Sequence, residues 1–352
     1  MNIRQETPID YKEVNNLHRE AFYNVYKPGC DEHYLMHILR DSDSFIKELS
    51  FVYEKDNKIV GHIAFSKAII TDENNNQIEV ACIGPIGVLP DYQNRGIGTA
   101  LIKHGKNSAK EMGYIAILLY GDPLYYSKCG FQQAYKYRIT TKDGNFSNAL
   151  QVLILNPPKT SKIKGRFSEN NLFTVDEKKS AEFDKNYPPK EKLENTKEQK
   201  RFSQIIKADK YYNNFLIRNP TYKNNLVIFE QFGTPYTKLA DDLAQLILSG
   251  KKTATCSRYT KYTNHVKKGQ LTVVLSSEDE PLCIIKTVKT EYKKMNEVTK
   301  DFAKAEGEGD RTLKYWYDVH KNFFSSELIQ ENKEFSDDIL LICEQFKVIH
   351  VF

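Results

Sequence analysis

The sequence predicts two folded domains, a mixed α/β domain followed by a small β-barrel domain. In the first half, apolar strands lead into a glycine-containing turn and a helix, and another apolar strand follows at residues 114–120. This order is typical of an α/β sandwich. In the second half, short strands are spaced as they are in small barrels. The 352 residues suffice for two domains of ordinary size.

The composition is that of a folded globular protein, with 40% hydrophobic and 28% charged residues. A formal net charge of +5 is compatible with an anionic ligand or RNA but does not demand nucleic acid. The N-terminal residues lack the apolar core of a secretory signal, and no run approaches the ~18 apolar residues of a membrane span. The six cysteines have no spacing that suggests disulfides or a metal site. We therefore expect a cytoplasmic protein with no membrane partner and no metal.

The first half begins with a predicted helix at residues 10–25, in which Val14, Leu17 and Ala21 share one face. Strands are then expected at residues 50–54, 59–67 and 78–88, with turns at 56–57 and 72–77. The last of these strands enters the stretch that carries the clearest functional signal.

That stretch is a glycine turn between a strand and a helix, Gln93-x-x-Gly96-x-Gly98. The first N–H groups of a helix have no internal partner, and the helix dipole is positive there. Glycines let the backbone approach an anion closely, so this turn is a candidate phosphate site.

Two motifs in the first half resemble the GCN5-related N-acetyltransferases (the GNAT superfamily). The segment IGVLPDYQNRGIGTALI is similar to the pyrophosphate loop of that family, and GDPLYYSKCGF is similar to its closing Tyr-x-x-x-Gly-Phe signature. Together they are closest to the bacterial YhbS-like group, and the resemblance covers roughly residues 1–155. It implies a mixed-sheet acetyltransferase domain that uses acetyl-coenzyme A as co-substrate.

The resemblance also implies which residues bind the co-substrate and which act on it. The pyrophosphate would bind the turn formed by Gln93, Asn94, Arg95, Gly96, Ile97, Gly98 and Thr99, with Arg95 contributing mostly its backbone. The pantetheine arm would pair with the strand edge at Ile86, Gly87 and Val88, because its amides can mimic a strand. Tyr126 would be the general acid that protonates the departing thiolate. Direct transfer is the rule in this family, so no acyl intermediate is expected on Cys129.

The sequence leaves the general base and the acceptor open. Glu20, His33 and Glu79 are candidates for the base, and a chain of water molecules is an alternative. The acceptor is expected to be a primary amine on a small molecule or a peptide. Irregular loops at residues 24–43 and 136–148 would contact it, and neither loop carries a diagnostic cluster.

After a strand at residues 150–155, residues 156–196 are expected to form an extension and linker, rich in Lys and Glu but with several apolar anchors. A helix is predicted at 197–218, where Asn219-Pro220 stops it. The second half predicts a helix at 237–248, another near 312–324, and strands at 226–232, 270–275, 282–292 and 339–351.

The second half resembles the ASCH domain, a PUA-like β-barrel linked with RNA, over roughly residues 197–352. The segment FGTPYTKLADDLAQLILSGKKTAT and the block EGEGD at 306–310 carry this resemblance. Some ASCH proteins hydrolyse acetylated cytidine, and the resemblance matches Lys252, Thr255 and Glu306 to that activity. In that chemistry a Lys of lowered pKa would activate the Thr hydroxyl. The other interpretations are a cleft that binds RNA or a nucleotide-like ligand, and RNA cleavage.

The sequence therefore predicts a GNAT domain at residues 1–155, an extension at 156–196 and an ASCH domain at 197–352. The predicted activity is acetyl transfer from acetyl-coenzyme A to a primary amine, with RNA or nucleosides as partners of the ASCH domain. The alternative is an RNA-associated binding protein, or an amidohydrolase of acetylated cytidine, in which the GNAT domain is accessory. The oligomeric state cannot be predicted from the sequence.

Overall fold

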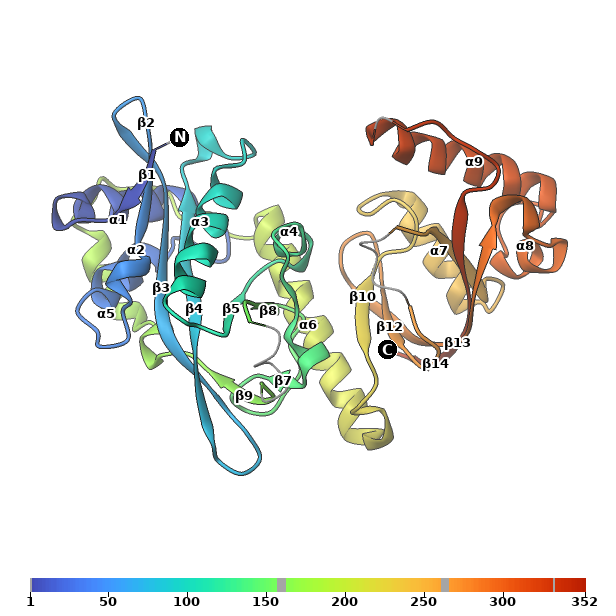
Figure 1. Cartoon of the computed structure of the whole chain (residues 1–352), viewed down its shortest axis with the longest axis horizontal. Helices are drawn as coiled ribbons and strands as arrows, with labels where there is room; N and C mark the ends of the chain where they lie inside the picture. Colours follow the sequence, from blue (N-terminus) through green and yellow to red (C-terminus); the bar gives the residue numbers. More distant parts are fainter. Residues whose placement is uncertain (1, 157–162, 261–265, 332) are drawn as a thin grey trace. The chain divides into compact units, whose positions relative to one another are not determined.

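A computed structural model of the chain describes residues 2–156, 163–260, 266–331 and 333–352 (Figure 1). The chain divides into two compact units, Met1–Ser203 and Gln204–Phe352. The division falls within one helix, α6 (Lys197–Arg218). Within the described ranges, no helix is both long enough and apolar enough to cross a membrane.

The first unit is built on a nine-stranded sheet with a main strand order β1-β2-β3-β4-β5-β8-β6. Its strands are β1 (Asn2–Gln5), β2 (Phe51–Lys55), β3 (Lys58–Thr71), β4 (Gln77–Val88), β5 (Ala116–Tyr120), β6 (Gln132–Gln133), β7 (Ile139–Thr140), β8 (Leu150–Ile154) and β9 (Gly165–Ser168). Neighbouring strands on the main path are antiparallel except β4 and β5, which are parallel and joined through a helix, as parallel strands require.

Helices cover both faces of this sheet. They are α1 (Tyr11–Phe22), α2 (Glu32–Leu39), α3 (Ile97–Glu111), α4 (Pro123–Lys128) and α5 (Glu177–Asp184). Alternation along β3 separates the two faces. A Cβ atom at Gly61 would lie 2.7 Å from Ile97 of α3, whereas His62 makes a 2.8 Å hydrogen bond to His18 of α1.

Residues 32–39 form a helix where the sequence predicted an irregular loop. The prediction of an irregular segment at 24–43 is wrong for these residues, which form α2 and bury Leu35, Met36 and Leu39. The segment is too short for its apolar spacing to stand out, so burial against the sheet, rather than local propensity, makes it helical.

The segment after β8 returns to the first unit. Strand β9 pairs antiparallel with β3, and a Cβ atom at Gly84 of β4 would lie 2.7 Å from the Phe173 ring. Helix α5 is tied to α1 by Arg19, whose Nε donates to Asp184 Oδ1 at 2.6 Å and whose Nη2 donates to the Pro188 carbonyl at 3.0 Å. Arg19 is 1% exposed, so the residues after β8 are held by an ion pair whose cationic partner is buried.

The second unit has a five-stranded mixed sheet in the order β10-β12-β13-β14-β11. Its strands are β10 (Val227–Glu230), β11 (Ala254–Arg258), β12 (Leu271–Leu275), β13 (Pro281–Lys294) and β14 (Leu340–Val351). Its helices after α6 are α7 (Lys238–Leu248), α8 (Lys300–Glu306) and α9 (Leu313–Gln330). In the described part of the chain, the two end strands, β10 and β11, do not pair with each other. The sequence missed β11 and α8, which are short.

Arg19→Ala should destabilise the first unit by about 2–3 kcal/mol, because it removes the charged hydrogen bonds of this buried guanidinium to Asp184 and to the Pro188 carbonyl. Urea unfolding followed by far-UV circular dichroism measures this change. The fluorescence of Trp316, the single tryptophan, reports on the second unit in the same sample. Lys185→Ala is the matched control, because its ion pair with Glu182 is more than two-thirds exposed and should contribute less than ~1 kcal/mol. A loss for Arg19→Ala no larger than that of the control would contradict the structural role of this pair.

Candidate active site

The central feature of the first unit is the separation of β4 from β5. These parallel strands pair at two positions, the second being Cys82 with Leu118, and then β4 runs on to Val88 while β5 ends at Tyr120. Beyond that point Ile86–Val88 pair with β3 on one edge. On the edge that faces β5, none of the described strands pairs with them. An extended ligand with amide groups can therefore bind there as an added strand.

The start of α3 lies directly after this edge. The loop bends through two left-handed residues, Asn94 (φ 58°) and Gly96 (φ 80°), before the helix begins at Ile97. The Ala100 N–H makes the 2.9 Å bond to the Gly96 carbonyl that opens the helix. The N–H groups of Ile97 to Thr99 consequently have no intrahelical acceptor and form an anion site at the positive end of the helix dipole.

The side chains of this loop brace the turn. Gln93 Nε2 donates to the Val88 carbonyl at 3.0 Å, and the Arg95 guanidinium lies 5.7 Å from the centre of the Tyr92 ring. The groups of this loop that are left to meet an anion are mainly backbone N–H groups.

Tyr126 of α4 lies at the end of β5. Its ring packs edge-on against Phe131 at 5.6 Å, and a Cβ atom at Gly121 would lie 2.2 Å from its Cε2, so this position requires glycine. Burial raises the pKa of the Tyr126 hydroxyl well above its usual range. The hydroxyl therefore stays protonated at neutral pH, the state a proton donor needs.

Tyr125 takes a different direction. A Cβ atom at Gly98 would lie 2.4 Å from the Tyr125 hydroxyl oxygen, and this hydroxyl also bonds the side chain of Thr99. Its ring is therefore at the start of α3, and the two adjacent tyrosines contact different parts of the site. Burial raises the pKa of the nearby Cys129 thiol, so Cys129 has little thiolate character.

A cavity of about 310 Å³ opens at the end of β5. Tyr120, the loop at 141–145 and the segment from Phe167 to Thr174 line it, and the Glu169 carboxylate lies among them. Burial raises the pKa of Glu169 to about 7, although Lys142 opposes the shift. Burial also raises the pKa of Tyr120, and the charge of Glu169 adds to it, so the two groups are close. Glu169 also acts on Cys82, at the point where β4 and β5 separate.

The base candidates named from the sequence have other partners. Glu20 accepts a 2.6 Å hydrogen bond from Lys190, and Glu79 accepts one of 3.4 Å from Tyr114. His33 is fully buried, and burial lowers its pKa to about 4. None of the three is among the described residues that line the cavity.

Sequence reasoning missed Glu169. It lies after the strand that closes the family resemblance, and only the pairing of β9 with β3 brings it to the end of β5. A lone Glu in a charged segment has no pattern that could have indicated this position.

In the second unit, Lys252 and Glu306, two of the three residues named from the family resemblance, are in contact. Lys252 Nζ donates to Glu306 Oε2 at 2.7 Å and to Glu308 Oε1 at 2.6 Å, with Lys252 and Glu306 almost fully buried. Burial alone would lower the pKa of Lys252, but the two carboxylates raise it above its ordinary value. This is the opposite of the lowered pKa that the amide-hydrolysis hypothesis requires, and a fully charged Lys is no base.

Thr255 is not brought to this pair. In β11 it is paired with Glu344, whereas the next residue, Cys256, is paired with Cys343 and packs with α8 and α9. Because successive side chains in a strand point to opposite faces, Thr255 faces away from the side on which Cys256 and Glu306 meet.

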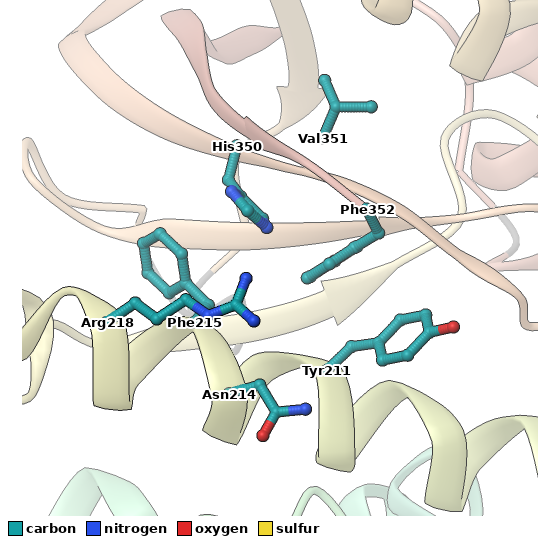
Figure 2. Close-up of a pocket in the computed structure, with 7 residues that line it drawn as sticks. All are labelled: Tyr211, Asn214, Phe215, Arg218, His350, Val351 and Phe352. Atoms are coloured by element: carbon teal, nitrogen blue, oxygen red, sulfur yellow. The ribbon is translucent and has the colours of Figure 1, made fainter.

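A second cavity, of about 260 Å³, lies between α6 and β14. It is lined by Tyr211, Phe215 and Arg218 of α6 and by His350 and Phe352 at the end of β14. Figure 2 shows the Arg218 guanidinium directed toward the rings of His350 and Phe352. The rings of Tyr211 and Phe352 are 5.3 Å apart. This combination of aromatic faces and one exposed cation suits a planar, anionic ligand.

Comparison with known proteins identifies both units. The model of the acetyltransferase (GNAT) family matches residues 11–131, and the model of the ASCH domain matches residues 228–350. The "Uncharacterized N-acetyltransferase YhbS" of Escherichia coli strain K12 is 30% identical over 152 residues, which are 43% of this chain and 86% of that protein. The chain therefore belongs to the GNAT acetyltransferase family and is an acyltransferase, and it also has an ASCH domain.

Two solved structures are similar to the separate units. The Escherichia coli YhbS structure in complex with CoA is 26% identical, covers 49% of this chain and 91% of that one, and gives a TM-score of 0.44. The ASCH domain from Lactobacillus crispatus JV V101 is 33% identical, covers 41% of this chain and 95% of that one, and gives a TM-score of 0.39.

Proposed function

We propose that the chain transfers an acetyl group from acetyl-coenzyme A to a primary amine. The observation that carries this proposal is the meeting of an unpaired strand edge, Ile86–Val88, with the open helix start at Ile97–Thr99. The edge would take the amides of the pantetheine arm, and the helix start would take the pyrophosphate. The proposal assigns transfer to residues 1–155 with the extension at 156–196, and ligand binding to residues 197–352.

In the transfer step the amine nitrogen attacks the thioester carbonyl, a C–N bond forms and the C–S bond breaks. The departing thiolate takes the proton of the Tyr126 hydroxyl, and the amine proton goes to a base. Glu169 is the base in this proposal. The support for this assignment is the cavity at the end of β5, which has the size and polarity to hold an amine acceptor. The Glu169 carboxylate in this cavity is partly buried and has a pKa of about 7, which suits a general base.

We further propose that the ASCH unit binds RNA or a nucleotide-like ligand and does not hydrolyse amides. The cavity of Tyr211, Arg218 and Phe352 supports binding, because bases stack on aromatic rings and phosphates pair with Arg. The charged state of Lys252 weighs against hydrolysis. RNA or a nucleoside would then be a partner that brings the acceptor amine.

Tyr126→Phe should lower kcat by about 10²-fold or more and leave the Kd of acetyl-coenzyme A unchanged, since only proton donation is lost. Calorimetry gives the Kd, and release of CoA with the best acceptor from a panel of amines, peptides and nucleosides gives kcat. Tyr125→Phe is the matched control; because that hydroxyl contacts the start of α3, it should alter acetyl-coenzyme A binding and spare kcat. Absence of saturable acetyl-coenzyme A binding would overturn the proposed reaction, whereas full activity of Tyr126→Phe would rule out only the assignment of Tyr126 as the general acid.

Glu169→Gln should abolish the rise of kcat/KM through about pH 7, because the base acts only when ionised. A pH profile of both proteins from pH 5 to 9 measures this limb. The raised folded pKa means that the ionised carboxylate disfavours folding, so stability falls as pH increases from the unfolded pKa through about 7. The variant should therefore be at least as stable as the parent at pH 8. An unchanged pH limb in a folded variant would rule out Glu169 as the base.

Tyr211→Ala should weaken binding of single-stranded RNA by about tenfold through lost stacking, and Arg218→Ala should reduce the salt dependence of binding by about one charge. Fluorescence anisotropy at several salt concentrations measures both effects. Lys314→Ala removes an exposed charge of the same unit outside this cavity and serves as the control. If both variants bind like the control, RNA does not use this cavity.

A further inference from the structure

Three side chains of different chemistry meet in the second unit. They are Cys256 of β11, Glu306 at the end of α8 and His320 of α9. Their Sγ, carboxylate oxygen and ring nitrogen all lie within 4.8 Å of one another. Thiolate, carboxylate and imidazole are the ligand types that bind zinc and similar divalent ions.

Outer hydrogen bonds orient two of these groups. His320 Nδ1 is 2.8 Å from the Trp316 carbonyl, which can only accept, so Nδ1 carries a proton and donates it. Trp316 Nε1 donates to Glu306 Oε1 at 3.1 Å, and its ring stacks on His320 with centres 4.4 Å apart. A histidine whose second nitrogen donates to a backbone carbonyl is the arrangement that supports metal-binding imidazoles.

His320 presents its second ring nitrogen to the cluster. Its Nε2 lies 3.7 Å from Glu306 Oε1. Because Nδ1 donates to the Trp316 carbonyl, Nε2 is the nitrogen that is left to bind a metal ion.

The surrounding charges favour a divalent cation. Among the residues that the structure describes, Lys252 is the one ammonium that contacts Glu306 and Glu308, so these three side chains have a net negative charge. A divalent ion, with Cys256 ionised by binding, would bring the group to neutrality. Glu306 is 1% exposed, and Lys252 and Trp316 already hydrogen-bond its two oxygens, so the carboxylate is fixed in place for a ligand role.

We propose that Cys256, Glu306 and His320 bind a zinc-class divalent ion. Zinc–ligand bonds of roughly 2.0–2.3 Å place tetrahedral ligand atoms about 3.3–3.8 Å apart, so the most distant pair must close by ~1 Å. Three protein ligands leave the fourth position for water or a ligand of the ASCH unit. Sulfur and nitrogen ligands exclude magnesium and calcium as the preferred ions. The assignment is independent of acetyl transfer and contrasts with the absence of a metal expected from the cysteine spacing.

The test is titration of the full chain, freed of metal by a chelator, with Co²⁺. One equivalent should produce intense visible bands of four-coordinate cobalt and a near-ultraviolet thiolate-to-cobalt band, both lost when Zn²⁺ is added. Emission of Trp316 should be quenched in the same titration, because the ring stacks on a ligand.

Variants show whether the cobalt ion binds to Cys256 and His320 or to another thiol of the chain. Cys256→Ser should lose the thiolate band, and His320→Gln should weaken Co²⁺ binding by about 10–100-fold while keeping that band at high Co²⁺. Cys129→Ser, in the other unit, should behave like the parent. A parent protein that shows no thiolate band at one equivalent would overturn the site, and so would a band kept in Cys256→Ser. If Cys256→Ser does not fold, the results with the parent and with His320→Gln still decide whether this cluster binds the metal ion.

Discussion

The first unit depends on one constraint, the divergence of two parallel strands after a short pairing. Because β5 separates from β4 beyond Cys82, β4 keeps a strand partner on one edge and has none on the other among the strands that the structure describes. The connection between the strands must pass through α3, and this sets the open start of that helix beside the free edge. The same divergence exposes the end of β5, where Tyr126 and the cavity with Glu169 lie. Under the proposed function, one departure from regular pairing therefore provides the setting for the donor, the general acid and the acceptor.

The second unit is organised by charge. Lys252 and Glu306 are 2% and 1% exposed, and neither could be buried alone without a large loss of hydration. Glu306 also accepts from Trp316, so α8, α9 and the start of β11 are fixed by one carboxylate. Such a group is rigid and strongly polar, which suits recognition of a ligand better than general base chemistry by its lysine.

Local patterns in the sequence predicted much of this. Helix 197–218 was predicted from its apolar spacing, and Asn219-Pro220 marks its C-terminal end. The glycine loop at 93–98 was recognised because its motif is local and its conformation depends on its own backbone. Helix α2 was missed because its eight residues form a helix through burial rather than propensity. Glu169 was missed because its position depends on pairing between strands about a hundred residues apart, β3 and β9. The amide-hydrolysis hypothesis needs a lowered pKa for Lys252, and the sequence could not show that two carboxylates raise it, since a motif match with Glu306 says nothing of the second carboxylate, Glu308.

The segment after β8 has a consequence for how such a protein can diversify. It pairs with β3, covers Gly84 of β4 and is held by Arg19, yet it follows the part of the chain that matches the acetyltransferase family model. One wall of the cavity at the end of β5 is thus built by a segment that lies outside the match to the family model. Under the proposed function, changes in this wall would alter which acceptors fit the cavity while the strand edge of β4 and the start of α3 stay the same. Acceptor selectivity and donor binding would then be able to evolve separately within a single folded unit.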